Sequence, residues 1–388
     1  MMQSSSCAAA ILPYAVSALV GLHAAPACAA QIEEAARGSE SFRVVAYVAG
    51  WAMPAVIHGE KLTHINFAFA RIAPDGRAVL ADSASEANLA RLVALKRTNP
   101  RLKVILSIGG WQADGFSDAA LTDASRGVLA DSAVDLVRRH SLDGVDIDWE
   151  YPGQGVAGIR YRAADRQNFT RLLRSLRKKL DLASDGQGRS GGDRYTVTIA
   201  SADREYFDHT EMDKLHVYLD WINVMSYDFF NSLTATTGHH AGLYPAALAS
   251  PTDRNADASV KQHLAAGIPA GKLLLGVAFY GRGFAGVRAL NNGLNQPYQR
   301  YEADHAYAEL AERLIDNPDF VRYWDERAKA PYLWNSAART FITYEDPQSI
   351  AIKADYVKSH HLGGIMFWEL GQDRDDELLD VIIKSLRR

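Results

Sequence analysis

The stretch LDGVDIDWEYPG, residues 142–153, places four acidic side chains in an otherwise apolar run that reads as a β-strand. Side chains of a strand alternate between its two faces, so Asp146, Asp148 and Glu150 share one face. The residues between them, Trp149 included, are apolar and lie on the opposite face. Such a strand is expected to bury its apolar face against helices, while its acids point into an enclosed space.

Eight short runs rich in β-branched or aromatic residues follow one another along the chain. They are residues 43–50, 62–70, 102–110, 142–150, 195–201, 220–228, 272–281 and 362–370. Most intervals carry apolar residues at helical spacing, as in 86–99, 126–140, 166–181 and 257–267. Near-continuous apolar strands that alternate with helices indicate a parallel sheet covered by helices. Eight such units predict an α/β fold, the (β/α)8 or TIM barrel, rather than an open doubly wound sheet.

The interval between the seventh and eighth strands is too long for a single helix. Residues 284–346 contain a helical segment at 307–316 and an aromatic segment at 331–346. We therefore expect a small α+β insertion between strand 7 and helix 7, which corresponds to residues 349–360. The predicted catalytic barrel spans residues 42–388, with the insertion inside it.

Residues 1–29 differ in composition from the rest of the chain, because an apolar segment ends in small residues that fit an A-x-A cleavage site at Ala27–Ala29. We interpret them as a secretory signal peptide, although no Lys or Arg precedes the apolar segment. A membrane anchor is the alternative, but the segment is short for a span, which needs about 20 residues. Both cysteines, Cys7 and Cys28, lie in this leader, so the mature chain would have no thiol. We expect a secreted protein, extracellular or periplasmic, without stable membrane association after cleavage.

Composition excludes some partners. The 388 residues carry a formal net charge of -4 and no long acidic or basic block. This disfavours nucleic acid as a partner. We expect a soluble monomer after cleavage of the leader.

The row of acidic side chains in residues 142–153 predicts catalytic chemistry. In a barrel Glu150 would lie nearest the C-terminal mouth, where barrel active sites are found, with Asp148 and Asp146 below it. Ionisation of all three acids is costly in free energy, because repulsion and partial desolvation raise the pKa of at least one. A retained proton suits a general acid, so we assign Glu150 to protonate a leaving group. The alternatives are an exposed edge strand or a Mg²⁺ or Ca²⁺ site, but no metal-binding motif accompanies the acids. We expect no metal and no cofactor.

Several motifs resemble those of glycoside hydrolase family 18, the chitinases. The resemblance is carried by SIGGW at 107–111 and by DGVDIDWEYPG at 143–153, which contains the pattern D-x-x-D-x-D-x-E. MSYDF at 225–229, YGRGF at 280–284 and GGIMFWEL at 363–370 match elements of that family on strands six, seven and eight. The resemblance implies a TIM barrel that hydrolyses chitin or chitooligosaccharides, with an insertion similar to that of one bacterial chitinase subgroup.

The resemblance implies a catalytic role for each matching residue. Glu150 would be the acid/base, Asp148 would orient and polarise the acetamido group of the substrate, and Asp146 would be its buried neighbour. Tyr227 would join them, and together with Asp228 it would contact the acetamide. The acetamide oxygen, rather than a second carboxylate, would attack C1 of its own sugar, with net retention.

The resemblance also implies a set of sugar-binding positions. Trp368 would floor the subsite where the bond breaks, with Met225 beneath the sugar, and Ser107 would hydrogen-bond the lower acids. The remaining implied contacts are Tyr47, Phe69, Trp111, Tyr280 and Arg282. Aromatic rings suit this role because pyranose rings present apolar C–H faces. We expect Trp149 and Trp221 instead to be core residues that face the helices.

The sequence defines neither one wall of the cleft nor the mode of action. The end of strand five, SADREY at 201–206, departs from the family pattern, which leaves the cleft wall near Asp203 undefined. Endo or exo action is equally undetermined. The competing functions are an endo-β-N-acetylglucosaminidase acting on N-glycans, a lectin-like barrel without catalysis, and a metal-dependent hydrolase. The presence of Glu150 argues against the lectin-like barrel.

Overall fold

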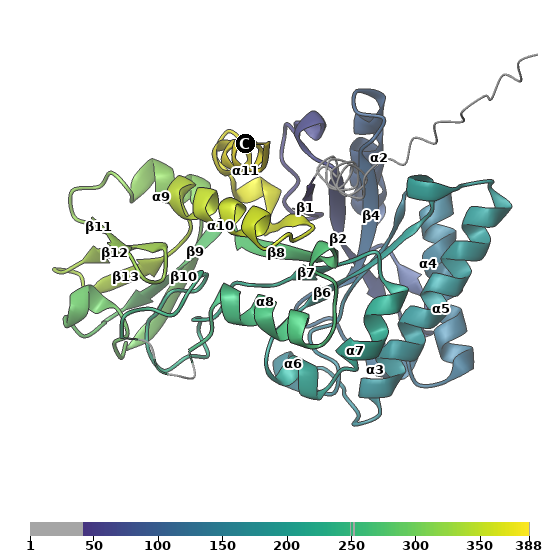
Figure 1. Ribbon diagram of the computed structural model, residues 1–388, viewed down its shortest axis with the longest axis horizontal. Helices are drawn as coiled ribbons and strands as arrows, with labels where there is room; N and C mark the ends of the chain where they lie inside the picture. The colour runs from purple at the N-terminus through teal and green to yellow at the C-terminus, as the bar shows by residue number, and fades with distance from the viewer. Residues whose placement is uncertain (1–41, 249, 251–252, 388) are drawn as a thin grey trace, which may run out of the picture. The chain divides into compact units, whose positions relative to one another are not determined.

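Eight parallel strands form a closed barrel in the part of the chain that the structure, a computed structural model, describes: residues 42–248, 250 and 253–387 (Figure 1). The strands are β1 (Arg43–Ala49), β2 (His64–Ile72), β4 (Lys103–Gly109), β5 (Gly144–Asp148), β6 (Thr196–Ser201), β7 (Trp221–Val224), β8 (Leu273–Ala278) and β14 (Gly364–Trp368). They pair in the order β1-β14-β8-β7-β6-β5-β4-β2, and β1 also pairs with β2, which closes the sheet. The short strand β3 (Ala78–Val79) pairs antiparallel with β2. The predicted (β/α)8 barrel is confirmed.

Helices follow most of these strands and surround the barrel (Figure 1). They are α2 (Ser83–Ala94), α3 (Phe116–Ala119), α4 (Asp123–Arg139), α5 (Asp165–Gly186), α6 (Glu205–Asp208), α7 (Met212–Leu215), α8 (Ala256–Ala265), α10 (Pro347–Ser359) and α11 (Glu377–Arg387). Short 3₁₀ turns occupy Gly59–Lys61, Leu95–Arg97, Val156–Gly158, Gly191–Asp193, His216–Tyr218, Ala270–Lys272, Asn291–Gly293 and Leu370–Gln372. Four of these helices start at polar caps: the side chains of Asp82, Thr122, Asn255 and Asp346 accept hydrogen bonds from first-turn amides of α2, α4, α8 and α10. These caps satisfy backbone donors that would otherwise lack partners.

A second, antiparallel sheet lies in the chain between β8 and α10. Its strands are β9 (Tyr280–Ala285), β10 (Arg300–Ala306), β11 (Val321–Asp325), β12 (Ala330–Asn335) and β13 (Thr340–Thr343), in the order β10-β9-β13-β12-β11, with α9 (Tyr307–Arg313) after β10. The run 272–281, which the sequence suggested as one strand, is divided at Phe279 between β8 of the barrel and β9 of this sheet. The second sheet therefore begins at Tyr280, a few residues before the range 284–346.

The alternation expected for the acidic strand is present in β5. Val145, Ile147 and Trp149 are buried in the large apolar core between strands and helices. Trp149 stacks on Phe116 at a centroid distance of 5.2 Å and meets Phe169 edge-on at 5.5 Å. These contacts fix the outward face of β5, and the acids consequently face the interior of the barrel.

The expected orientation of Trp221 is wrong. Its ring is buried inside the barrel, at the start of β7, where its Nε1 donates to Asn223 Oδ1 at 3.0 Å. The ring also meets His64 at 4.6 Å, and the guanidinium of Arg43 lies 5.1 Å from its centroid. The physical reason is strand alternation: Trp221 shares its face with the inward Asn223, whereas Ile222 packs toward the helices.

The leader prediction for residues 1–29, with Cys7 and Cys28, lies outside the described residues. Among the helices that the structure describes, none combines the length and the apolar character needed to cross a bilayer.

Candidate active site

The deepest acid of the row is held by hydrogen bonds from four strands. Asp146 is fully buried and accepts bonds from Tyr47 Oη at 2.8 Å, Ser107 Oγ at 2.7 Å, Thr198 Oγ1 at 2.6 Å and Asn223 Nδ2 at 3.2 Å. The sequence suggested Tyr47 and Ser107 but missed Thr198 and Asn223. Asn223 is the single polar side chain of the apolar strand β7, and this signal could have identified it, whereas Thr198 shares β6 with Thr196 and Ser201 and does not stand out.

Burial is the largest cause of the raised pKa of all three acids, whereas the sequence analysis invoked charge repulsion as well. Desolvation raises the pKa of Asp146, although its four hydrogen bonds oppose the rise. Desolvation raises the pKa of Asp148 well above its usual value, and the charges of Glu150 and Asp146 add to this. Desolvation also raises the pKa of Glu150 to about 7; a hydrogen bond from Tyr151 opposes this and the charge of Asp228 adds to it. The acids therefore share a proton near neutral pH, and Glu150, which is partly exposed, can pass it to a ligand.

The backbone of the neighbouring strand closes tightly over Asp148. Gly109 has a φ of +124°, and a Cβ at this position would lie 2.0 Å from the carbonyl oxygen of Asp148. The next residue, Gly110, donates its N–H to that carbonyl at 2.9 Å. Only glycine fits at residue 109, which explains the first of the two glycines in SIGGW. The side chain of Asp148 keeps one buried oxygen, Oδ1, without a hydrogen-bond partner among the described residues, so this oxygen is available to a ligand.

A fourth carboxylate, Asp228, lies just beyond β7 in a separate hydrogen-bond network. Its Oδ1 accepts bonds from Tyr280 Oη at 2.7 Å and Arg282 Nε at 2.9 Å, and its Oδ2 accepts one from Arg282 Nη2 at 2.6 Å. Nδ1 of the buried His240, which sequence reasoning missed, is 3.7 Å from Oδ1. Desolvation disfavours ionisation of Asp228, but His240 and Arg282 outweigh it and hold its pKa below the usual range. Asp228 is thus a fixed negative charge that acts on Glu150.

Arg282 connects this network to the second sheet. Its Nη1 donates to Tyr301 Oη at 2.9 Å and to Asp304 Oδ1 at 2.5 Å, and both partners lie on β10. The guanidinium therefore contacts carboxylates from the barrel and from the second sheet at once. Tyr280 and Arg282 both come from β9, so the sheet supplies part of the site.

Aromatic side chains form a platform on the side of the mouth made by β14, β1 and β2. Trp368 lies nearly parallel to Phe69, with centroids 5.7 Å apart and an interplanar angle of 13°, and is 5.7 Å from Tyr47. Trp51, which sequence reasoning missed, follows β1, is 66% exposed and lies 6.2 Å from both Phe69 and Trp368. Trp111 is 47% exposed and lies apart from this group, after β4. Within this cluster Trp51 is exposed and Trp368 is partly exposed, and such rings suit the apolar face of a sugar.

Tyr227 and Met225 lie next to this platform inside the barrel mouth. Both belong to the interior cluster that also contains Tyr47 and Phe69. Burial raises the pKa of the Tyr227 phenol well above its usual value, with a further rise from the charge of Asp148. Tyr227 is therefore a neutral hydroxyl that can donate a hydrogen bond to a ligand.

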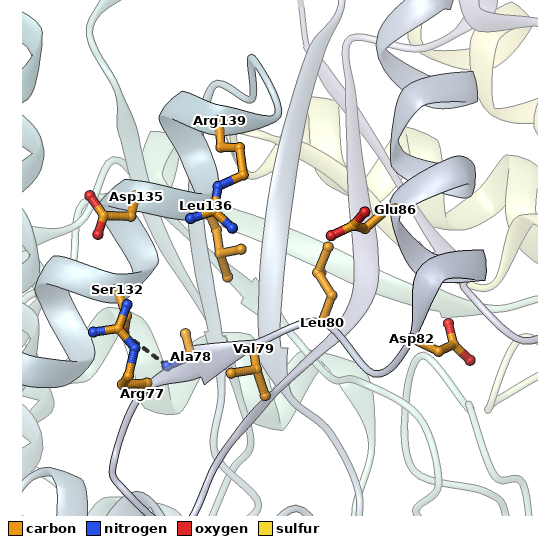
Figure 2. Close-up of a pocket in the computed structure, with 10 residues that line it drawn as sticks. All are labelled: Arg77, Ala78, Val79, Leu80, Asp82, Glu86, Ser132, Asp135, Leu136 and Arg139. Carbon is orange, nitrogen blue, oxygen red and sulfur yellow. Dashed lines mark hydrogen bonds between the residues drawn. The ribbon is translucent and has the colours of Figure 1, made fainter.

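Two other features do not coincide with this site. In the described part of the chain, no group of three or more His, Cys, Asp or Glu side chains is placed to hold a metal ion. A hollow of about 270 Å³ lies between α2, β3 and α4 (Figure 2). Its charged lining residues, shown in Figure 2, are Arg77, Asp82, Glu86, Asp135 and Arg139. None of its lining residues belongs to the carboxylate site at the barrel mouth.

Comparisons with known proteins agree with this geometry. Residues 43–373 match the sequence model of glycosyl hydrolases family 18. The chain is 38% identical over 410 residues to chitinase A1 of Niallia circulans, covering 88% of this chain and 58% of that protein. It is 32% identical to chitinase B of Serratia marcescens, covering 82% and 75% of the two chains. A family 18 N-acetylglucosaminidase from Paenibacillus barengoltzii has a similar structure, with a TM-score of 0.83, 43% identity and coverage of 89% and 100%.

The barrel, its inward acids and these matches define a glycoside hydrolase. The chain belongs to glycosyl hydrolases family 18. It spans 58% of the length of the Niallia circulans relative, so the activity of that whole protein is not transferred to it directly.

Proposed function

We propose that this chain is a chitinase that hydrolyses β-1,4 linkages between N-acetylglucosamine units of chitin and chitooligosaccharides. The observation that carries the proposal is Glu150, a partly exposed acid with a pKa of about 7, at the open end of a buried row of aspartates. The chitinases among its relatives support the choice of substrate.

In the first step Glu150 gives its proton to the glycosidic oxygen as the C1–O bond breaks. The acetamide oxygen of the same sugar attacks C1, so the bond to the leaving sugar is replaced by an intramolecular C–O bond. Asp148 sits below Glu150 with one oxygen free, and in this proposal that oxygen accepts the acetamide N–H and orients the nucleophile. The charge of Asp146, which lies below, helps to raise the pKa of Asp148.

In the second step Glu150, now a carboxylate, removes a proton from water. The water oxygen attacks C1 from the side that the leaving sugar vacated, and the acetamide is released with net retention. Glu150 thereby takes up a proton from water, which replaces the one that left with the leaving sugar. Its pKa of about 7 suits both steps, because the two protonation states are close in free energy near neutral pH.

The surrounding residues would bind and orient the sugar. Tyr227 and Asp228 contact the acetamide group in this proposal, and Trp368 carries the ring of the sugar at the cleavage site. Met225 lies beneath it, and Ser107 stabilises the buried acids. The other proposed contacts are Tyr47, Phe69, Trp111, Tyr280 and Arg282.

The proposal is tested by replacing Glu150 with Gln and assaying a defined chitohexaose. The wild-type chain should release shorter chitooligosaccharides, and Glu150→Gln should bind chitohexaose without turnover while its thermal unfolding stays unchanged. Oligomers deacetylated at the sugar of the cleavage site should resist hydrolysis, since they lack the nucleophile. Wild-type turnover by the Gln variant would contradict the assignment.

A second candidate function is an exo-acting N-acetylglucosaminidase. It is favoured by the solved relative described as an N-acetylglucosaminidase, which is 43% identical and matched over its whole length. The same chitohexaose assay separates the two: early release of the monosaccharide alone supports exo action, and early release of intermediate oligomers supports a chitinase.

We propose that residues 1–29 direct secretion and that the mature chain is a monomer without membrane association. We further propose that the second sheet is the insertion that deepens the cleft. The contacts of Arg282 with both Asp228 and Asp304 support this.

A further inference from the structure

An ion pair between Asp203 and Arg254 lies at the barrel mouth and is not used by the mechanism above. Asp203 follows β6, and Arg254 precedes the cap of α8. Arg254 Nε donates to Asp203 Oδ1 at 2.8 Å, and its Nη2 donates to the same oxygen. The Asp203 side chain is only 4% exposed, whereas that of Arg254 is 26% exposed. The carboxylate is thus a buried anchor, and the guanidinium reaches the surface.

Arg254 is close to the residues that follow Glu150 and Asp228 in the chain. Its guanidinium carbon lies 4.9 Å from the ring centroid of Phe229, the residue after Asp228. It also acts on Tyr151, the residue after Glu150: burial raises the pKa of the Tyr151 phenol, and the positive charge of Arg254 opposes this rise. The guanidinium therefore lies on the side of the barrel mouth formed by the ends of β5, β6 and β7.

The order of strands places this pair on the leaving-group side. The aromatic platform stands on β14, β1 and β2, and in the closed barrel these strands lie across from β5, β6 and β7. If the sugar that bears the reacting acetamide lies on Trp368, its glycosidic oxygen must reach Glu150 at the end of β5. The sugar beyond that oxygen then lies over the ends of β5 to β7. Arg254 is on this side, together with Tyr151 and the exposed Trp111.

The chemistry of the pair fits a sugar hydroxyl. Asp203 engages two N–H groups of Arg254, and a guanidinium carries more donors than these two. A donor held in place by a buried carboxylate is pre-oriented, so little side-chain entropy is lost when it binds a hydroxyl. We infer that Arg254, anchored by Asp203, is a specificity-determining residue that hydrogen-bonds the sugar on the leaving-group side of the scissile bond. This inference rests on the proposed function.

The test compares two substrates that differ in their leaving group. Chitotetraose leaves a sugar in the proposed subsite, whereas 4-nitrophenyl chitobioside leaves a nitrophenol that has no sugar hydroxyls. For the double variant Asp203→Asn/Arg254→Met, which avoids an unpaired buried carboxylate, kcat/KM for chitotetraose should fall about tenfold, equivalent to about 1.4 kcal/mol. The value for the nitrophenyl substrate should stay within about twofold, since the interactions with Glu150 are unchanged.

Arg254→Lys provides a second variant if the double variant is unstable. Lysine keeps a positive charge beside Asp203 but has fewer N–H donors than arginine. We therefore expect a smaller loss of kcat/KM, confined to chitotetraose. Arg194→Met is the matched control, because Arg194 pairs with Asp181 and Asp185 before β6, at the opposite end of that strand from the mouth. It should leave both substrates unaffected.

The outcomes separate this inference from the proposed function. Equal losses on both substrates, or no loss on either, would overturn the role of Arg254. A wild-type chain that cleaves neither substrate would instead overturn the proposed function. A selective loss on chitotetraose, with an unchanged thermal unfolding midpoint, supports the inference.

Discussion

Raising the pH from about 6 to about 9 should lower kcat/KM for chitooligosaccharides about ninetyfold, because Glu150 must be protonated to act. Burial raises the pKa of Glu150 to about 7, so about nine-tenths of the molecules carry the proton at pH 6 and about one-hundredth at pH 9. The basic limb of the profile should therefore have its midpoint near neutral pH. An ordinary exposed glutamate would lose its proton near 4.5, and the activity would then already be low at pH 6.

Asp228→Asn tests the physical cause of this midpoint. Desolvation is the largest cause of the raised pKa of Glu150, and the negative charge of Asp228 adds to it by favouring the neutral acid. Removing that charge lowers the pKa of Glu150, so the basic limb should move to lower pH. Burial remains in the variant, and the midpoint should accordingly stay above 4.5. The relative profile gives this midpoint even though the variant also loses a substrate contact and is slower overall.

The assay measures kcat/KM for a fluorogenic chitobioside from about pH 4 to about pH 10. The pH dependence of kcat/KM gives the pKa of the essential acid in the free enzyme. Asp304→Asn is the matched control: it removes another carboxylate that binds Arg282 but does not belong to the charges acting on Glu150. Its midpoint should equal that of the wild type. A basic limb that stays in place or rises in Asp228→Asn would refute the reasoning, provided that thermal unfolding shows both variants folded over this range.

Three further predictions concern stability. Tyr47→Phe removes one of four donors to the deepest acid and should lower the free energy of unfolding by about 1–3 kcal/mol in urea titrations, whereas an unchanged value would show that bond to be dispensable. Trp149→Ala removes a core side chain and should lower the free energy of unfolding by about 3–5 kcal/mol. Trp111 is exposed, so Trp111→Ala should change the free energy of unfolding by no more than about 0.5 kcal/mol while it raises KM. Equal losses in the two variants would contradict the burial of Trp149. Lys353→Met should lower the free energy of unfolding by about 3–5 kcal/mol, because it leaves the buried carboxylate of Glu345 without its cation. Adding Glu345→Gln should recover part of this loss. A double variant without any recovery would argue against a stabilising ion pair.

The barrel and the acidic row could be predicted because their signals are local. Apolar runs separated by amphipathic segments mark parallel strands and covering helices wherever each strand is buried on both faces. Strict alternation along β5 placed Asp146 and Asp148 inside the barrel and Trp149 outside it. The residues expected at the mouth, such as Tyr47 and Phe69, followed from motif positions and strand ends, and the structure brings these two rings together around Trp368.

The contacts that were missed join segments far apart in the chain. His240 and Arg254 belong to the long connection after β7, where no periodicity fixes the direction of a side chain. The orientation of Trp221 was predicted wrongly on a strand of only four residues, where a single inward neighbour decides the face. The division at Phe279 depends on where the chain leaves the barrel for the second sheet, and the sequence of an apolar run does not mark that point.

The central claim is that Glu150 holds a proton near neutral pH. The most direct measurement is the infrared difference spectrum between the wild-type chain and Glu150→Gln, recorded from about pH 5 to about pH 9. The account predicts a protonated carboxylic acid band, present only in the wild type, that disappears with a midpoint of about 7. A wild-type spectrum without that band at pH 6 would contradict the account.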